Sequence, residues 1–143
     1  MVQSRAFFET LEFGDTVLIV RHGPLTIEAQ CDTLENGFTF DRVRLIVTTT
    51  VPGVVAAIQS GDYPIAGGTE FLDPTTPEDR REVAFHTADP GVPSYSNDPQ
   101  NASIIAPSGE VILIDGETLG LGLNIFDVDC LAAGTYQTFK GRL

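Results

Sequence analysis

The chain alternates short apolar runs, rich in β-branched residues, with turn signals formed by Gly, Pro, Asn and Asp. The pattern is clearest over residues 16–58 and 102–139, where no apolar stripe of helical period reaches the length of an ordinary helix. A two-residue period between frequent turns is typical of antiparallel strands with one buried face. We therefore expect an all-β protein, an antiparallel β-sandwich or jelly roll of roughly nine or ten strands.

The whole chain, residues 1–143, is expected to form a single domain. A chain of 143 residues can bury a hydrophobic core without depending on metals. Its hydrophobic content of 42% and charged content of 20% are ordinary for a globular protein. The sequence contains neither a repeat nor a flexible linker that would divide it.

Several strands are specific enough to predict. Residues 16–20 are apolar after Thr16, which predicts a central strand covered on both faces. Residues 25–32 alternate strictly, which places four side chains on one face: Leu25, Ile27, Ala29 and Cys31.

The register of the next hairpin can also be predicted. Asn36-Gly37 favours a tight turn, but a two-residue turn would place Cys31 opposite Arg42. One extra residue on the returning strand places Cys31 opposite Val43 instead, so we expect a β-bulge near residues 40–42. Asp115-Gly116 predicts a second tight hairpin.

The charge balance limits the partners. The formal net charge is −12 and the isoelectric point is about 4.2. Such a surface repels phosphate backbones and anionic lipid, so no nucleic-acid partner is expected. The longest apolar run, residues 54–58, is too short for a membrane span.

No metal site and no cofactor are predicted. Calcium binding to acidic loops is the alternative, but the spacing of the acidic residues matches no EF-hand. These residues are Asp73, Glu78, Asp79, Asp98, Asp127 and Asp129. The histidines His22 and His86 show no zinc-site spacing.

The chain has two cysteines, one in each half. Cys31 and Cys130 both lie in or beside strand-like segments, and a distant pair in an acidic all-β chain favours one disulfide. Two buried free thiols are the alternative. A disulfide favours a secreted or cell-surface protein. The polar residues after Val2 fit either a cytoplasmic protein or the mature start of an exported one.

Two long segments, residues 59–80 and 87–101, are rich in Gly, Pro, Asp, Ser and Thr and are expected to be ordered loops. Residues 76–79 have the chemistry of a helix start, so we expect at most one helical turn there. Tyr63, Phe71 and Tyr95 lie in these segments and could stack on sugar rings, although the chain has no Trp. Asn101-Ala102-Ser103 matches the N-glycosylation sequon.

Arg21-His22-Gly23 follows an apolar strand and resembles the opening signature of the histidine phosphatase superfamily. The resemblance implies His22 as a phosphoryl-accepting nucleophile and Arg21 as a phosphate ligand. It would also require a second His, for which His86 is the candidate, and a further Arg, either Arg80 or Arg81. That family is α/β, whereas this chain reads as all-β. The alternative is that Arg21 and His22 simply end a strand at the surface.

A broader resemblance covers most of the chain. The segments GPLTIEAQC, FLDPTTPED and NIFDVDC, in that order, resemble those of short secreted bacterial all-β proteins. This resemblance implies export and a β fold but transfers no chemistry. We expect a non-catalytic, exported domain with a structural or adhesive role and possible self-association. A carbohydrate-binding module is the alternative, and a phosphatase is a further one.

Overall fold

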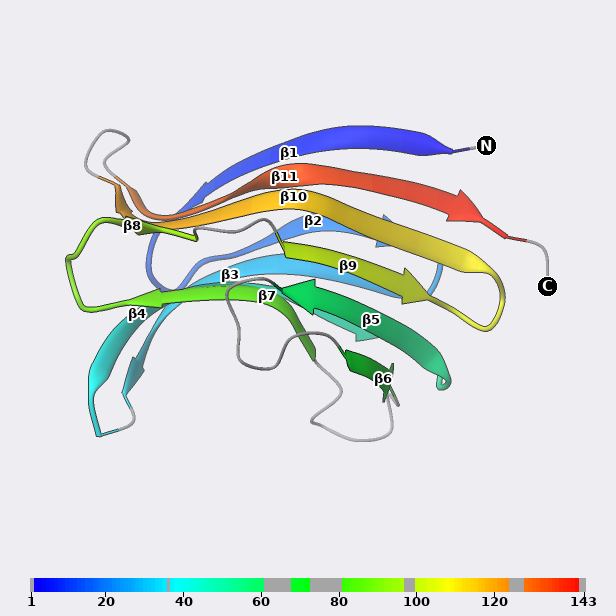
Figure 1. Cartoon of the computed structure of the whole chain (residues 1–143), viewed down its shortest axis with the longest axis horizontal. Coiled ribbons are helices and arrows are strands. Elements are labelled where there is room, and N and C mark those ends of the chain that lie inside the picture. The colour runs from blue at the N-terminus through cyan, green and yellow to red at the C-terminus, as the bar shows by residue number, and fades with distance from the viewer. Residues whose placement is uncertain are drawn as a thin grey trace.

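The computed structural model describes residues 2–35, 37–60, 68–72, 81–96, 100–123 and 128–141. Within these ranges the chain forms eleven strands and no helix, so the predicted all-β class is confirmed with slightly more strands than expected (Figure 1). The helical turn expected at residues 76–79 lies outside the described residues. No helix in the described ranges is long and apolar enough to cross a membrane.

The strands form two antiparallel sheets. The order in the seven-stranded sheet is β1 (Gln3–Leu11), β11 (Val128–Lys140), β10 (Glu110–Leu123), β9 (Gln100–Ile105), β5 (Val54–Ser60) and β6 (Gly68–Leu72), and β8 (Ser94–Tyr95) also pairs with β10. The order in the four-stranded sheet is β2 (Thr16–His22), β3 (Leu25–Glu35), β4 (Thr39–Thr49) and β7 (Arg81–Ala88).

One hydrophobic core draws its side chains from both sheets. The predicted inward face of β3 is confirmed, because Leu25, Ile27, Ala29 and Cys31 are all buried while the residues between them are half-buried. The opposing sheet contributes alternate residues of β10, among them Leu119 and Leu121, and these residues are also fully buried. The two-residue period therefore sorts each of these strands into a core face and an outer face.

The predicted register of the β3–β4 hairpin is correct, but its predicted cause is wrong. Cys31 pairs with Val43, as expected. The register is continuous from Glu35–Thr39 onward, so β4 carries no bulge near residues 40–42 in its pairing with β3. The extra residue lies in the connection itself, since three residues rather than two separate Glu35 from Thr39.

Two further predictions are corrected. Strand β2 is an edge strand of its sheet rather than a central one, and Leu18 is 49% exposed. Residues 115–116 do not form a hairpin, because β10 runs through them with a register shift between Asp115 and Thr118. Strands on both sides of β10 pair with it here, so the local turn preference yields a β-bulge instead of a reversal.

The predicted disulfide is present. Cys31 on β3 is bonded to Cys130 on β11, with the two Cα atoms 5.9 Å apart. Both cysteines are buried, and their strands belong to different sheets. The bond therefore joins the two sheets through the core, and it closes a separation of 99 residues.

Candidate functional site: a polar groove on the seven-stranded sheet

Three adjacent strands, β9, β10 and β11, present polar side chains on the face opposite the core. Ile112 and Ile114 point into the core and are buried, so Leu113 and Asp115 belong to the outer face. The register places Leu113 beside Ser103 on one side and Gln137 on the other. These three residues form one row across the sheet.

A second row lies one step further along the strands. Asp115 pairs with Thr135 on β11. On the other side, the register between β10 and β9 shifts after Ile114. Two residues of β10, Asp115 and Gly116, therefore face the single residue Asn101 of β9. Bulges commonly re-aim side chains beside a binding surface.

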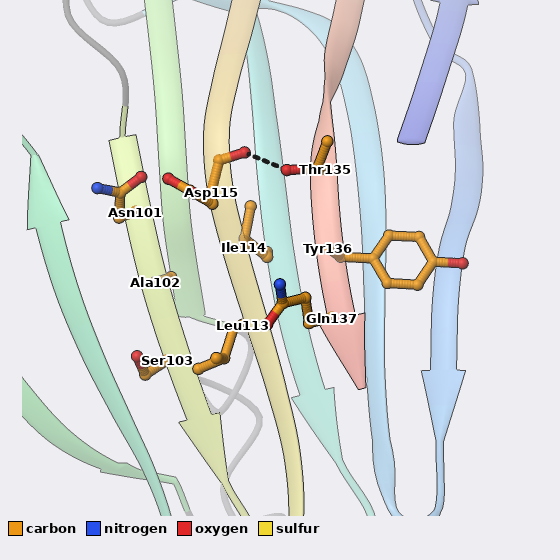
Figure 2. A pocket seen from close by; sticks show the side chains of 9 residues that line it. All are labelled: Asn101, Ala102, Ser103, Leu113, Ile114, Asp115, Thr135, Tyr136 and Gln137. Atoms are coloured by element: carbon orange, nitrogen blue, oxygen red, sulfur yellow. Dashed lines mark hydrogen bonds between the residues drawn. The ribbon is translucent and has the colours of Figure 1, made fainter. Parts of the chain in front are cut away.

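The two rows border a shallow groove of about 240 Å³ (Figure 2). Its lining residues are Asn101, Ala102, Ser103, Leu113, Ile114, Asp115, Thr135, Tyr136 and Gln137. The Thr135 hydroxyl donates a hydrogen bond to the Asp115 backbone carbonyl at 3.0 Å, which closes one end of the row. Figure 2 shows the Tyr136 side chain pointing away from the other lining residues, and its ring instead lies 6.3 Å from that of Phe7.

The side chains at the groove suit a neutral, hydroxyl-bearing ligand. The amides of Asn101 and Gln137 can both donate and accept hydrogen bonds, as can the hydroxyl of Ser103. Asp115 contributes an exposed carboxylate, and the lining includes no Lys, Arg or His. A phosphate or carboxylate ligand would therefore meet negative charge without a compensating cation.

None of the aromatic residues predicted to bind sugar is among the described residues that line this groove. Tyr63 lies outside the described residues. Phe71 is on β6, where its backbone pairs with Val55. Tyr95 is 45% exposed on β8 and pairs with Gly120, five residues along β10 from Asp115 and therefore roughly 17 Å away.

Sequence reasoning missed the groove because its residues come from three separate segments. In the sequence, Asn101 and Ser103 are distinguished only as parts of an N-glycosylation sequon. The one usable signal was the alternation of polar and apolar residues along 101–104, which assigns residues to faces but not to neighbours, whereas residues 111–114 are all apolar.

The two histidines of the phosphatase-like set lie on different strands of the four-stranded sheet. His22 ends β2, and its Nε2 lies 2.9 Å from the Phe139 backbone oxygen, to which it donates a hydrogen bond. His86 is on β7, where its Nε2 lies 2.7 Å from the Ser94 hydroxyl oxygen. Strands β2 and β7 are opposite edges of the four-stranded sheet, so the two histidines are at least roughly 14 Å apart. Of the two candidate arginines, Arg80 lies outside the described residues and Arg81 begins β7.

A charged cluster lies beside the turn that follows His22. The Ser108 hydroxyl donates a hydrogen bond to Glu110, which holds the pKa of that carboxyl below its ordinary value, and Lys140 adds a smaller effect. A Cβ on Gly23 would lie 2.8 Å from Glu110 Cγ, so the turn and the glutamate pack closely. This cluster connects the two sheets at one end of the molecule.

Among the described residues, no group of three or more His, Cys, Asp or Glu side chains is placed to hold a metal ion. Asp129, one of the acidic residues considered for calcium, accepts a hydrogen bond from the Phe13 backbone N–H at 3.0 Å. The others, Asp73, Glu78, Asp79, Asp98 and Asp127, lie outside the described residues.

Comparison with known proteins found no match to a family model, a curated protein or a solved structure.

Proposed function

We propose that this protein is a non-catalytic, exported β-sandwich or jelly-roll domain with a structural or adhesive role. The observation that carries the proposal is the buried Cys31–Cys130 bond between the two sheets. Disulfides persist in oxidising compartments, and a covalent link between the layers suits a domain that must keep its shape outside the cell.

The experiment measures the redox state and the location of the protein in its own cells. The protein from each cell fraction is alkylated with and without prior reduction, and its intact mass is determined. We expect it in the secreted or surface fraction, with two thiols labelled only after reduction. A fully reduced protein confined to the cytoplasm would overturn the proposal.

The non-catalytic part has its own test. Hydrolysis of p-nitrophenyl phosphate is measured for the natural chain and for His22→Ala. We expect no turnover above background for either protein. Turnover that disappears in His22→Ala would instead support the phosphatase alternative.

A second candidate function, glycan binding, is favoured by the polar groove alone. Its side chains can form the paired donor and acceptor contacts that sugar hydroxyls require. Binding to a glycan array is compared for Gln137→Ala and Asp115→Ala, with Tyr95→Ala as the matched control outside the groove. Loss confined to the first two variants would support the groove, whereas loss in Tyr95→Ala would favour an aromatic platform in the loops.

A further inference from the structure

Strand β1 is the most regular edge strand of the structure. It pairs with β11 without a register shift from Gln3–Thr138 to Leu11–Cys130, and among the described residues no strand pairs with its other side (Figure 1). The edge strands β2 and β7 both have register shifts, and β6 has only five residues. An unbulged edge exposes a row of backbone donors and acceptors that can pair with another strand.

Two residues of opposite charge lie at equal distances from the midpoint of β1. Phe7 is the central residue of Gln3–Leu11, and Arg5 and Glu9 lie two residues before and after it. Because side chains alternate, Arg5 and Glu9 occupy the same face of the strand. Neither residue forms an ion pair within the described part of the chain. If a second copy pairs antiparallel about a two-fold axis at Phe7, each Arg5 lies opposite Glu9 of the other copy.

The other two-fold registers lack this complementarity. In an antiparallel pair, two directly opposed residues either both turn their N–H and C=O groups toward the partner strand or both turn them away. Because this direction alternates along a strand, residues opposed across a two-fold axis differ in number by an even amount, and the axis passes through a residue position. An axis at Arg5 or at Glu9 would place like charges opposite each other. An axis at Ala6 or Phe8 would place Arg5 opposite an apolar side chain. The register centred on Phe7 also pairs all nine residues of the strand.

The opposite face of β1 is compatible with the same register. Ala6 would lie opposite Phe8 of the second copy, and this pair would occur twice about the axis. Phe8 is 58% exposed and Ala6 is exposed in the single chain. An aromatic ring over a small side chain covers apolar surface without crowding.

We propose that two copies of this chain form a symmetric dimer by antiparallel pairing of their β1 strands, with Arg5 opposite Glu9. This inference rests on the proposed structural role and names its partner, a second copy. The paired surface is small and each copy carries a net charge of −12, so the dimer is expected to be weak and to form at high local concentration.

The test is a charge-reversal cycle. Sedimentation equilibrium at physiological ionic strength is measured over about 10 µM to about 1 mM, where small interfaces associate. The variants are Arg5→Glu, Glu9→Arg and the double variant, which keeps the net charge of −12. Circular dichroism and thermal unfolding establish that each variant is folded.

We expect a monomer–dimer equilibrium that each single reversal weakens by about tenfold or more, because two ion pairs become two like-charge pairs. The double variant should restore the dimer. Net charge alone predicts differently, since Glu9→Arg reduces the overall repulsion and would strengthen association.

Three results would overturn the inference. They are a monomer at every concentration, an oligomer whose association neither charge reversal changes, and a dimer strengthened by Glu9→Arg. The second result leaves self-association in place but moves it to another surface. None of the three changes the redox state and location of the protein, which test the proposed function separately.

Discussion

Arg42 holds Asp32 with two parallel hydrogen bonds. Its Nε donates to Oδ1 at 2.8 Å and its Nη2 donates to Oδ2 at 2.7 Å. The two residues are direct partners across β3 and β4, on the face away from the core. This arrangement, with a weaker contribution from Arg44, holds the pKa of Asp32 below its ordinary value.

Replacement of Asp32 should therefore change the pH dependence of stability. A lowered pKa in the folded state stabilises the protein above the ordinary carboxyl pKa of about 4, and this stabilisation is lost as the pH falls. At neutral pH we expect Asp32→Asn to lower the free energy of unfolding by about 1 kcal/mol. Urea unfolding at pH 7 and pH 3 measures the free energy of unfolding of this variant, with Asp115→Asn as the exposed control. An equal loss of stability at both pH values would contradict a lowered pKa of Asp32 in the folded state.

Loss of the disulfide should cost more than loss of this ion pair. Removing a cross-link over 99 residues is expected to lower the free energy of unfolding by about 3–5 kcal/mol, because the unfolded chain regains freedom. Urea unfolding of the double variant Cys31→Ala, Cys130→Ala is compared with that of the reduced natural chain. The two should agree within about 1 kcal/mol, since both lack the bond. A double variant as stable as the oxidised protein would refute this prediction.

Two leucines test the assignment of strands to core and edge. Leu45 on β4 is fully buried, whereas Leu18 on β2 is 49% exposed. We expect Leu45→Ala to destabilise the protein by about 2–5 kcal/mol and Leu18→Ala by less than about 1 kcal/mol. Chemical denaturation measures both. Similar losses would mean that β2 is covered on both faces after all.

Two glycines with similar backbone conformations differ in the space around them. Gly14 has φ +95° with open space beside it, and Gly109 has φ +102° with the Gly141 backbone oxygen 2.5 Å from a built Cβ. Gly14→Ala should cost about 1–2 kcal/mol from conformational strain alone. Gly109→Ala should cost at least about 1 kcal/mol more, because the clash is with backbone. Thermal unfolding of both variants gives the difference, and equal losses would show that the neighbouring backbone yields freely.

Local pattern alone determined much of this fold. The alternation of Leu25, Ile27, Ala29 and Cys31 identified the core face of β3, because a two-residue period depends only on the residues themselves. The same pattern favoured Val43 over Arg42 as the partner of Cys31 on β4, since a register shifted by one residue would have placed a charged side chain on the core face. The two cysteines also predicted their own bond, since each lay on or beside a strand and no other thiol was available.

Tertiary structure decided which neighbours each strand received. The apolar run of β2 looks central, yet its place at a sheet edge depends on strands far away in sequence. Asp115-Gly116 favours a turn locally, but hydrogen bonding to β9 and β11 on both sides keeps β10 extended. The groove likewise exists only because register aligns three segments, and side-chain periodicity assigns a face without specifying what lies beside it.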